Sequence, residues 1–125
     1  EIDIYVTIKN GAFLYNPKDH SLQKIVSEDV REATGKQNFV RDAALNLVYV
    51  ADLTRMGEGD ETTKLITAAC DTGFIGQNVY LFCASEGLAT VFRASIDKEK
   101  LSEVLKLRPD QKITYSQTVG FPKGK

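Results

Sequence analysis

The sequence is poor in the residues that build hydrolytic and metal sites. His20 is the only histidine among 125 residues, and there are only two cysteines. A Ser-His-Asp or Cys-His arrangement would have to use His20, which stands beside a predicted turn. Zinc usually takes four nitrogen and sulfur ligands, and one histidine with two separated cysteines supplies few of them. We therefore expect neither a hydrolytic triad nor a zinc site.

The two cysteines, Cys70 and Cys83, fall on the same predicted helix, 13 residues apart. A rise of 1.5 Å per residue separates them by about 20 Å along the axis. A disulfide needs Cα atoms within about 7 Å of each other, so the two cannot pair in that helix. We interpret both as buried thiols that pack like small apolar residues.

Long apolar runs and a strong net charge are also missing. No run approaches the roughly 20 residues that span a bilayer. The net charge of −1 gives no field to attract nucleic acid or an anionic membrane. We expect one soluble domain over residues 1–125, without a nucleic-acid partner. The first residue is Glu1 rather than methionine, so the lack of a signal peptide says little; we expect a cytoplasmic protein, or a periplasmic one if a signal peptide was removed.

The first half of the chain is typical of short strands. Residues 2–8 alternate apolar and polar side chains, and Asn10-Gly11 predicts a turn into a second strand. Residues 21–26 predict a third strand. Ser27 then predicts the start of a helix that Gly35 ends, and 37–44 predicts a further helical turn. The apolar, β-rich run 45–51 predicts a central strand buried on both faces.

The second half predicts two helices and two strands. The longest helix runs from about Glu61 to Glu86 and is closed by Gly87. A strand over 88–96, an amphipathic helix over 98–107 and a last strand over 112–119 follow. The order predicts an α+β fold: a mixed, mainly antiparallel sheet packed with helices, one of them long and central.

The long helix carries a stripe of mostly small residues. The stripe recurs at spacings of three and four and consists of Ala69, Gly73, Gly76, Tyr80 and Cys83. Small side chains let another backbone come close, and apolar residues also occur around the rest of the helix. A helix that is apolar most of the way round is buried. Two interpretations stay open: a core helix of a compact monomer, or a helix that pairs with its twin in a dimer.

Two short motifs flank the strand after this helix: Gly87-Leu88-Ala89-Thr90 before it, and Ala94-Ser95-Ile96-Asp97 at its end. With the ending Val119-Gly120-Phe121-Pro122, their order and spacing resemble the FMN-dependent nitroreductase family. The resemblance implies the nitroreductase-like fold. It also implies that the backbone N–H groups of Ala94 and Ser95 face the flavin ring at N5 and O4.

The sequence departs from the commoner family pattern at this strand. Ala89 replaces a glycine, and Arg93 stands where an apolar residue is usual. Arg93 either places a positive charge near the flavin or substrate, or is a solvated strand residue. The basic tail resembles the family's phosphate-contacting ending, which makes Lys123 and Lys125 candidates, although a frayed charged terminus would look the same.

The resemblance implies that the chain is the C-terminal portion of a nitroreductase-like domain, because nothing in it matches the family's N-terminal arginine-rich phosphate motif. It implies an FMN-dependent NAD(P)H oxidoreductase that passes hydride through flavin N5 to a small organic acceptor, such as a nitro compound or quinone. It also implies a homodimer, or association with another chain. The alternative is a non-catalytic dimerising or binding domain of the same fold that holds no flavin.

Overall fold

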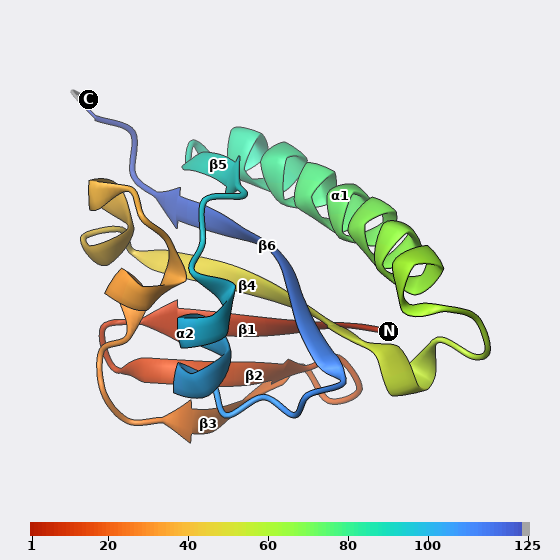
Figure 1. Cartoon of the computed structure of the whole chain (residues 1–125). Helices are drawn as coiled ribbons and strands as arrows, with labels where there is room; N and C mark the ends of the chain where they lie inside the picture. The colour runs from red at the N-terminus through yellow and green to blue at the C-terminus, as the bar shows by residue number, and fades with distance from the viewer. Residues whose placement is uncertain (124–125) are drawn as a thin grey trace.

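The computed structural model describes residues 1–123. It contains one six-stranded antiparallel sheet with the strand order β3-β2-β1-β4-β6-β5 (Figure 1). The strands are β1 (Ile2–Ile8), β2 (Gly11–Asn16), β3 (Ser21–Val26), β4 (Leu45–Asp52), β5 (Ala89–Arg93) and β6 (Gln111–Gly120). The helices are α1 (Glu61–Glu86), α2 (Lys98–Val104) and the short 3₁₀ helices η1 (Arg31–Thr34), η2 (Asn38–Arg41) and η3 (Leu53–Arg55). The predicted α+β class, with one long helix on a mainly antiparallel sheet, is confirmed.

The first three strands, each predicted from the sequence, pair in chain order as an antiparallel meander. β1 and β2 pair with Ile8 opposite Gly11, so the turn occupies the two residues between them. Gly11 has a φ of 140°, which favours glycine, and a Cβ there would collide with the carbonyl oxygen of Val26. Glycine is therefore needed both for the turn and for the close approach of β3.

The predicted helix over 27–35 is wrong in most of its length, because only η1 forms there. Asp29 explains the difference: its carboxylate accepts hydrogen bonds from the backbone N–H of Arg31 at 3.2 Å and from the Arg31 guanidinium at 2.8 and 2.9 Å. Such local bonds compete with those of a helix. The helical turn predicted over 37–44 is the shorter η2, and η3 lies directly after β4.

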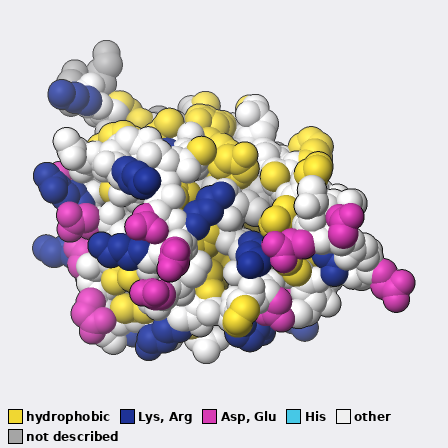
Figure 2. Space-filling view, viewed as in Figure 1, with side chains coloured by type: hydrophobic (Ala, Val, Ile, Leu, Met, Phe, Trp, Pro, Cys, Tyr) yellow, Lys and Arg dark blue, Asp and Glu magenta, His cyan; other side chains and the backbone are white. Residues whose placement is uncertain are grey.

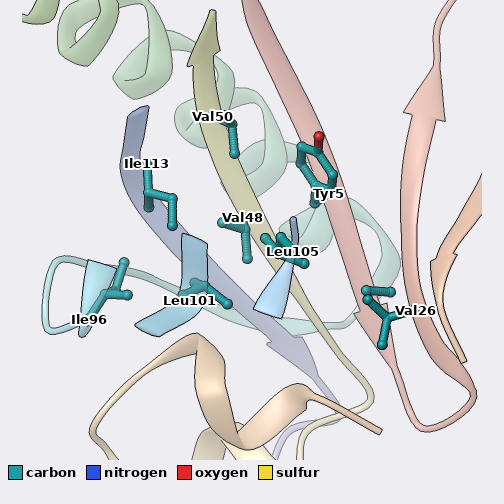
Figure 3. Packing of buried hydrophobic residues seen from close by; sticks show 9 residues of the cluster. Tyr5, Val26, Val48, Val50, Ile96, Leu101, Leu105 and Ile113 are labelled. Atoms are coloured by element: carbon teal, nitrogen blue, oxygen red, sulfur yellow. The ribbon is translucent and has the colours of Figure 1, made fainter. Parts of the chain in front are cut away.

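The main apolar core lies between α2 and the middle of the sheet (Figure 3). Leu101 and Leu105 are almost completely buried against side chains of β4 and β6, including Val50 and Ile113. α2 is shorter than the predicted 98–107, because Lys106 adopts a φ of 60° and turns the chain out of the helix. The amphipathic pattern of this segment was nevertheless a correct guide to the face that is buried.

α1 has the predicted bounds and covers the other face of the sheet. The Asp60 carboxylate accepts a hydrogen bond from Thr63 N at 2.7 Å and caps its start, and Gly87 ends it at a φ of 71°. Only a narrow inner face is buried: Ala68, Thr72, Gly76 and Cys83. The outer face is apolar but exposed, with Ile66, Phe74, Leu81 and Phe82 between 59% and 67% accessible. The prediction that α1 is buried on most of its surface is therefore wrong for a single copy of this chain.

The small-residue stripe of α1 has an intramolecular use. A Cβ on Gly76 would lie 2.6 Å from the ring of Phe92 on β5 and 3.3 Å from Oε1 of Gln117 on β6. Gly73, in contrast, is exposed, and a Cβ there would meet no atom of the described residues within 4 Å beyond the backbone of its own helix turn and its chain neighbours. Gly76 thus lets α1 approach its own sheet, which the sequence did not distinguish from the approach of a second helix.

Candidate functional site

The site begins where β5 leaves the sheet. β5 ends at Arg93, opposite Ser116 of β6, and is shorter than the predicted strand over 88–96. Ala94 and Ser95 are exposed and belong to no strand, whereas Arg93 before them and Ile96 after them are buried. Ile96 packs into the core under α2, so both ends of this short loop are anchored. Two small residues are therefore presented to solvent on a fixed support.

The backbone of this loop is only partly hydrogen-bonded. The carbonyl oxygen of Ser95 accepts from the backbone N–H of Lys36 at 3.1 Å. Within residues 1–123, the N–H groups of Ala94 and Ser95 donate no hydrogen bond. β5 is an edge strand, and the Phe92 N–H just before the loop donates to the hydroxyl of Tyr80 at 2.7 Å. The loop thus continues a sheet edge with two donors available to a ligand.

Arg93 points into the protein. It is 3% exposed, so the interpretation as a solvated strand residue is wrong. Its guanidinium donates to the Thr34 carbonyl at 2.9 Å, the Ser116 hydroxyl at 2.8 Å and the Thr118 hydroxyl at 2.6 Å. A longer contact of 3.2 Å reaches Oδ1 of Asn46. Burial lowers the pKa of Arg93 to about 10, so the side chain stays a cation at neutral pH.

Gln37 is a polar residue near this loop that the sequence analysis did not single out. Its side-chain oxygen, Oε1, is buried and has no hydrogen-bond partner within residues 1–123. Gln37 follows Lys36, whose N–H binds Ser95, so the bond between the two loops brings Gln37 to the same region. It also lines a hollow of about 540 Å³ together with Asp97 and Lys100. Nothing in the local sequence marks Gln37, because its position depends on contacts between distant segments.

The basic tail lies at the other end of β5. Ala89 pairs with Gly120, so the tail leaves the sheet a full strand away from Ala94 and Ser95. Lys123 is exposed there, and Lys125 lies outside the described residues. An apolar hollow of about 530 Å³ next to the tail is lined by side chains that include Phe39, Val91 and Phe121. Arg93, Ala94 and Ser95 are consecutive, but the Arg93 side chain points inward while Ala94 and Ser95 are exposed, and Lys123 does not lie beside them.

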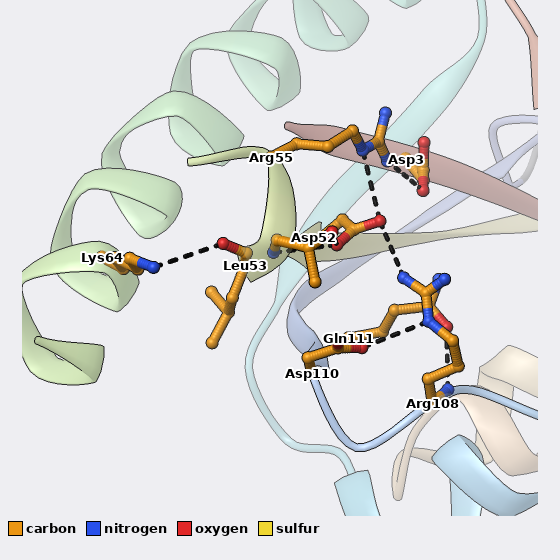
Figure 4. Close-up of polar contacts among 9 residues, drawn as sticks. Asp3, Asp52, Leu53, Arg55, Lys64, Arg108, Asp110 and Gln111 are labelled. Carbon is orange, nitrogen blue, oxygen red and sulfur yellow. Dashed lines mark hydrogen bonds and ion pairs between the residues drawn. The ribbon is translucent and has the colours of Figure 1, made fainter. Parts of the chain in front are cut away.

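Outside this loop, the main charged cluster of the described residues consists of ion pairs within the fold. A cluster of charges at the end of β4 is centred on Asp52, which is paired with Arg55 and Arg108 (Figure 4). In the described part of the chain, no three His, Cys, Asp or Glu side chains are grouped so that they could hold a metal ion. No helix among these residues combines the length and apolar character needed to cross a membrane.

Two proteins assigned to the nitroreductases are similar to this chain over most of its length. A protein assigned to the nitroreductases from Methanocaldococcus jannaschii is 29% identical over 119 residues, covering 86% of this chain and 59% of that protein. A crystal structure of a protein assigned to the nitroreductases from Ralstonia eutropha is 36% identical with a TM-score of 0.91, covering 99% of this chain and 59% of that one. This chain therefore spans about three-fifths of the length of these two relatives.

A more distant structural match is the NADPH:FMN oxidoreductase from Vibrio harveyi complexed with NAD⁺. It is 26% identical with a TM-score of 0.65 and covers 74% of this chain and 44% of that one. A family model described as "Nitroreductase family" matches residues 1–121 of this chain. With nearly the whole chain matched, and the sheet and long helix in place, the chain belongs to the nitroreductase family.

Proposed function

We propose that this chain is the C-terminal portion of an FMN-dependent NAD(P)H oxidoreductase. The proposed acceptor is a small organic molecule such as a nitro compound or a quinone. The observation that carries the proposal is the exposed loop Ala94-Ser95 at the edge of the sheet, whose two backbone N–H groups donate to no group of residues 1–123. FMN, when bound, supplies hydride transfer between a nicotinamide and the acceptor.

The chain offers groups that fit the polar edge of a flavin ring. That edge carries carbonyl oxygens and one N–H group, so it needs both donors and an acceptor. Ala94 and Ser95 provide the donors, and the buried oxygen of Gln37, which has no partner among residues 1–123, provides an acceptor. An unpaired buried oxygen costs stability, and a ligand N–H that reaches it after a rotation of the side chain would remove that cost. Small side chains at 94 and 95 also let a planar ring approach the backbone.

The role of the protein in this chemistry is to bind, orient and tune. Fixed N–H donors stabilise negative charge that develops on a bound ring, and they act best in a site closed to water. Arg93 and Ile96 are buried on either side of the loop, so the donors do not have to reorganise. No side chain at the loop is placed as a general acid or base among the described residues.

The phosphate end of FMN fits less completely. A phosphate monoester carries a charge near −2 and takes several cationic or backbone donors. Lys123 is the tail cation that the structure describes, and Lys125 is a further candidate from the sequence. We therefore expect the 125-residue chain alone to bind FMN weakly. An added upstream segment with arginines, as the longer relatives allow, should strengthen binding.

Fluorescence titration with FMN and with riboflavin tests this proposal. Riboflavin has the same ring and no phosphate, so it reports on the ring contacts alone. We expect similar, weak affinities for the two ligands in this chain, and a clear preference for FMN in the extended protein. Failure of both proteins to bind either ligand would favour the alternative, a dimerising or binding domain that holds no flavin. Tight FMN binding by this chain would show that the phosphate site is misplaced.

We also propose that the protein is a homodimer through the outer face of α1. Hydrophobic side chains gather over α1 in the space-filling view, whereas charged side chains gather over α2 and η1 (Figure 2). Ile66, Phe74 and Leu81 share one side of the helix and are each more than half exposed. Covering such a patch favours association.

Charge substitutions on α1 test the dimer. Phe74→Lys should convert dimer to monomer in sedimentation velocity without changing the circular dichroism. Leu22→Lys, at an exposed apolar residue of β3, is the matched control and should leave the dimer intact. Gly76→Leu is unsuitable, because the larger side chain would strike Phe92 within the same chain. A wild-type protein that stays monomeric at micromolar concentration would contradict the proposal.

A further inference from the structure

Arg93 is exceptional among the arginines of this chain. There are five, and the other four each form at least one ion pair with an aspartate or glutamate. Arg93 forms none with any carboxylate in residues 1–123, although it is the most deeply buried of the five. Every group that accepts its hydrogen bonds is a neutral oxygen. Burying a guanidinium without an opposite charge costs free energy. Packing alone therefore does not explain why an arginine occupies this position.

The contacts of Arg93 join the two segments that carry the proposed ring contacts. From the end of β5, Nη1 donates to the Thr34 carbonyl at 2.9 Å, and Nη2 lies 3.4 Å from the Thr34 hydroxyl. Two residues further along each segment, the Lys36 N–H donates to the Ser95 carbonyl at 3.1 Å. The segments 34–37 and 93–95 are thus held together at two points. Gln37 lies at the end of one and Ser95 at the end of the other.

The sequence around Gly35 is adapted to this arrangement. A Cβ on Gly35 would collide with Nη1 of Arg93 and would lie 3.1 Å from Cγ1 of Val40. The backbone of Gly35 is extended, with a φ of −175°, so other residues could adopt its conformation. The requirement for glycine therefore comes from the space that the guanidinium occupies.

The remaining hydrogen bonds fix the guanidinium to the sheet. Nε donates to the Thr118 hydroxyl, and Nη2 donates to the Ser116 hydroxyl and to Oδ1 of Asn46. Thr118 in turn donates to Oδ1 of Asn46 at 2.6 Å. Bonds from a charged donor are stronger than neutral ones, and the planar fork of arginine sets their directions. A lysine could keep the charge but could not reach this set of acceptors together.

We propose that Arg93 is a positioning residue of the cofactor site: it clamps segment 34–37 to the loop Ala94-Ser95 and so sets the spacing between the Gln37 acceptor and the backbone donors. The inference rests on the proposed function for its purpose, while the clamp itself is a property of the cofactor-free chain. Arg93 does not touch the cofactor in this proposal and acts through the two segments that do.

Amide hydrogen exchange of the cofactor-free protein tests the clamp directly. In Arg93→Met and Arg93→Lys, the Lys36 amide should exchange roughly tenfold faster, the size expected for losing one or two charge-assisted hydrogen bonds. Amides in the middle of α1 should be unchanged. Gly35→Ala should give the same local effect while leaving Arg93 in the sequence, because the added methyl group displaces the guanidinium. Unchanged Lys36 exchange in all three variants would overturn the proposal.

Riboflavin and FMN titrations of the same variants test the purpose of the clamp. We expect roughly tenfold weaker binding of both ligands, because the ring contacts are disturbed. Ile113→Val is the control for a general loss of stability, since it alters the apolar core away from the clamp. Equal weakening in Ile113→Val and Arg93→Met would overturn a positioning role. Absence of binding in the wild type would instead count against the proposed function and leave the exchange result to decide on the clamp.

Discussion

The two ends of one sheet face differ in the polarity of their buried side chains. Under α2, the face is apolar: Leu101 and Leu105 pack on Val50 and Ile113 (Figure 3). Toward the other end of β6, the buried side chains are polar and surround Arg93: Asn46, Ser116 and Thr118. A register shift in the β4–β6 pairing, between Val48 and Val50, separates the two ends.

This difference indicates that the apolar end mainly stabilises the fold, whereas the polar end fixes its geometry. Apolar burial stabilises without fixing directions, so the α2 end holds the sheet together and tolerates small shifts. A buried polar network is stable only when each member has its partner in place. The polar end therefore specifies one geometry, and it is the end from which the loop Ala94-Ser95 emerges. Stability and positioning can be perturbed separately if this division holds.

The largest effect is expected at the apolar end. Leu101 is completely buried, and Leu101→Ala should lower the free energy of unfolding by about 2–5 kcal/mol through lost burial and an unfilled cavity. Urea denaturation followed by circular dichroism measures this. Leu22→Ala, at a half-exposed position on β3, should change it by less than about 0.5 kcal/mol. Similar losses for the two variants would mean that the core does not lie where the structure puts it.

At the loop, the expected effect is on function rather than stability. In a flavin-loaded protein, Ser95→Pro should slow flavin reduction by NAD(P)H about a hundredfold relative to Ser95→Ala, because proline removes the N–H donor and alanine keeps it. Ser95 lies beyond the end of β5, so proline removes no bond of the sheet. Stopped-flow absorbance compares the variants, with circular dichroism as the check on folding. Equal rates would remove Ser95 from the cofactor site.

A moderate loss of stability is expected at the polar end. Thr118→Val keeps the shape of the side chain but removes the hydroxyl that accepts from Arg93 and donates to Asn46. Leaving these buried groups unpaired should cost about 1–3 kcal/mol in denaturation experiments. Ile113→Val on the same strand should cost about 0.5–1.5 kcal/mol. If Thr118→Val were the milder change, the polar network would not be specifying the geometry.

Local patterns in the sequence were enough for much of the fold. The bounds of α1 follow from a capping aspartate at one end and Gly87 at the other, and both act within a few residues. The segment 27–35 failed because the local bonds between Asp29 and Arg31 outweighed a plausible helix start. Periodicity could not reveal that competition, since both outcomes use the same residues.

The candidate site was harder to predict, because its groups come from distant segments. The resemblance to the nitroreductases pointed to Ala94 and Ser95, and the structure gives them an exposed, anchored position. The burial of Arg93 depends on Thr34, which lies 59 residues away, and no pattern near Arg93 signals it. Gln37 becomes a candidate only because its buried oxygen has no partner in the part of the chain that the structure describes. Such facts depend on packing and not on local sequence.

The smallest expected effect is a pH dependence at the end of β4, far from the polar network around Arg93. Burial alone would raise the pKa of Asp52, but hydrogen bonds from Thr54 and the nearby Arg108 outweigh it and hold the pKa below its usual value (Figure 4). A carboxylate with a depressed folded-state pKa stabilises the protein above its unfolded-state pKa of about 3.9. That contribution is lost as the pH falls through the lower, folded-state value.

Unfolding free energies measured between pH 6 and pH 3 should therefore decrease less steeply in Asp52→Asn than in the wild type. Asp110→Asn removes a charge from the same cluster at a more exposed position, where ion pairs contribute little, and it should leave the slope closer to that of the wild type. A slope that Asp52→Asn leaves unchanged would show that this charge cluster does not contribute to acid stability.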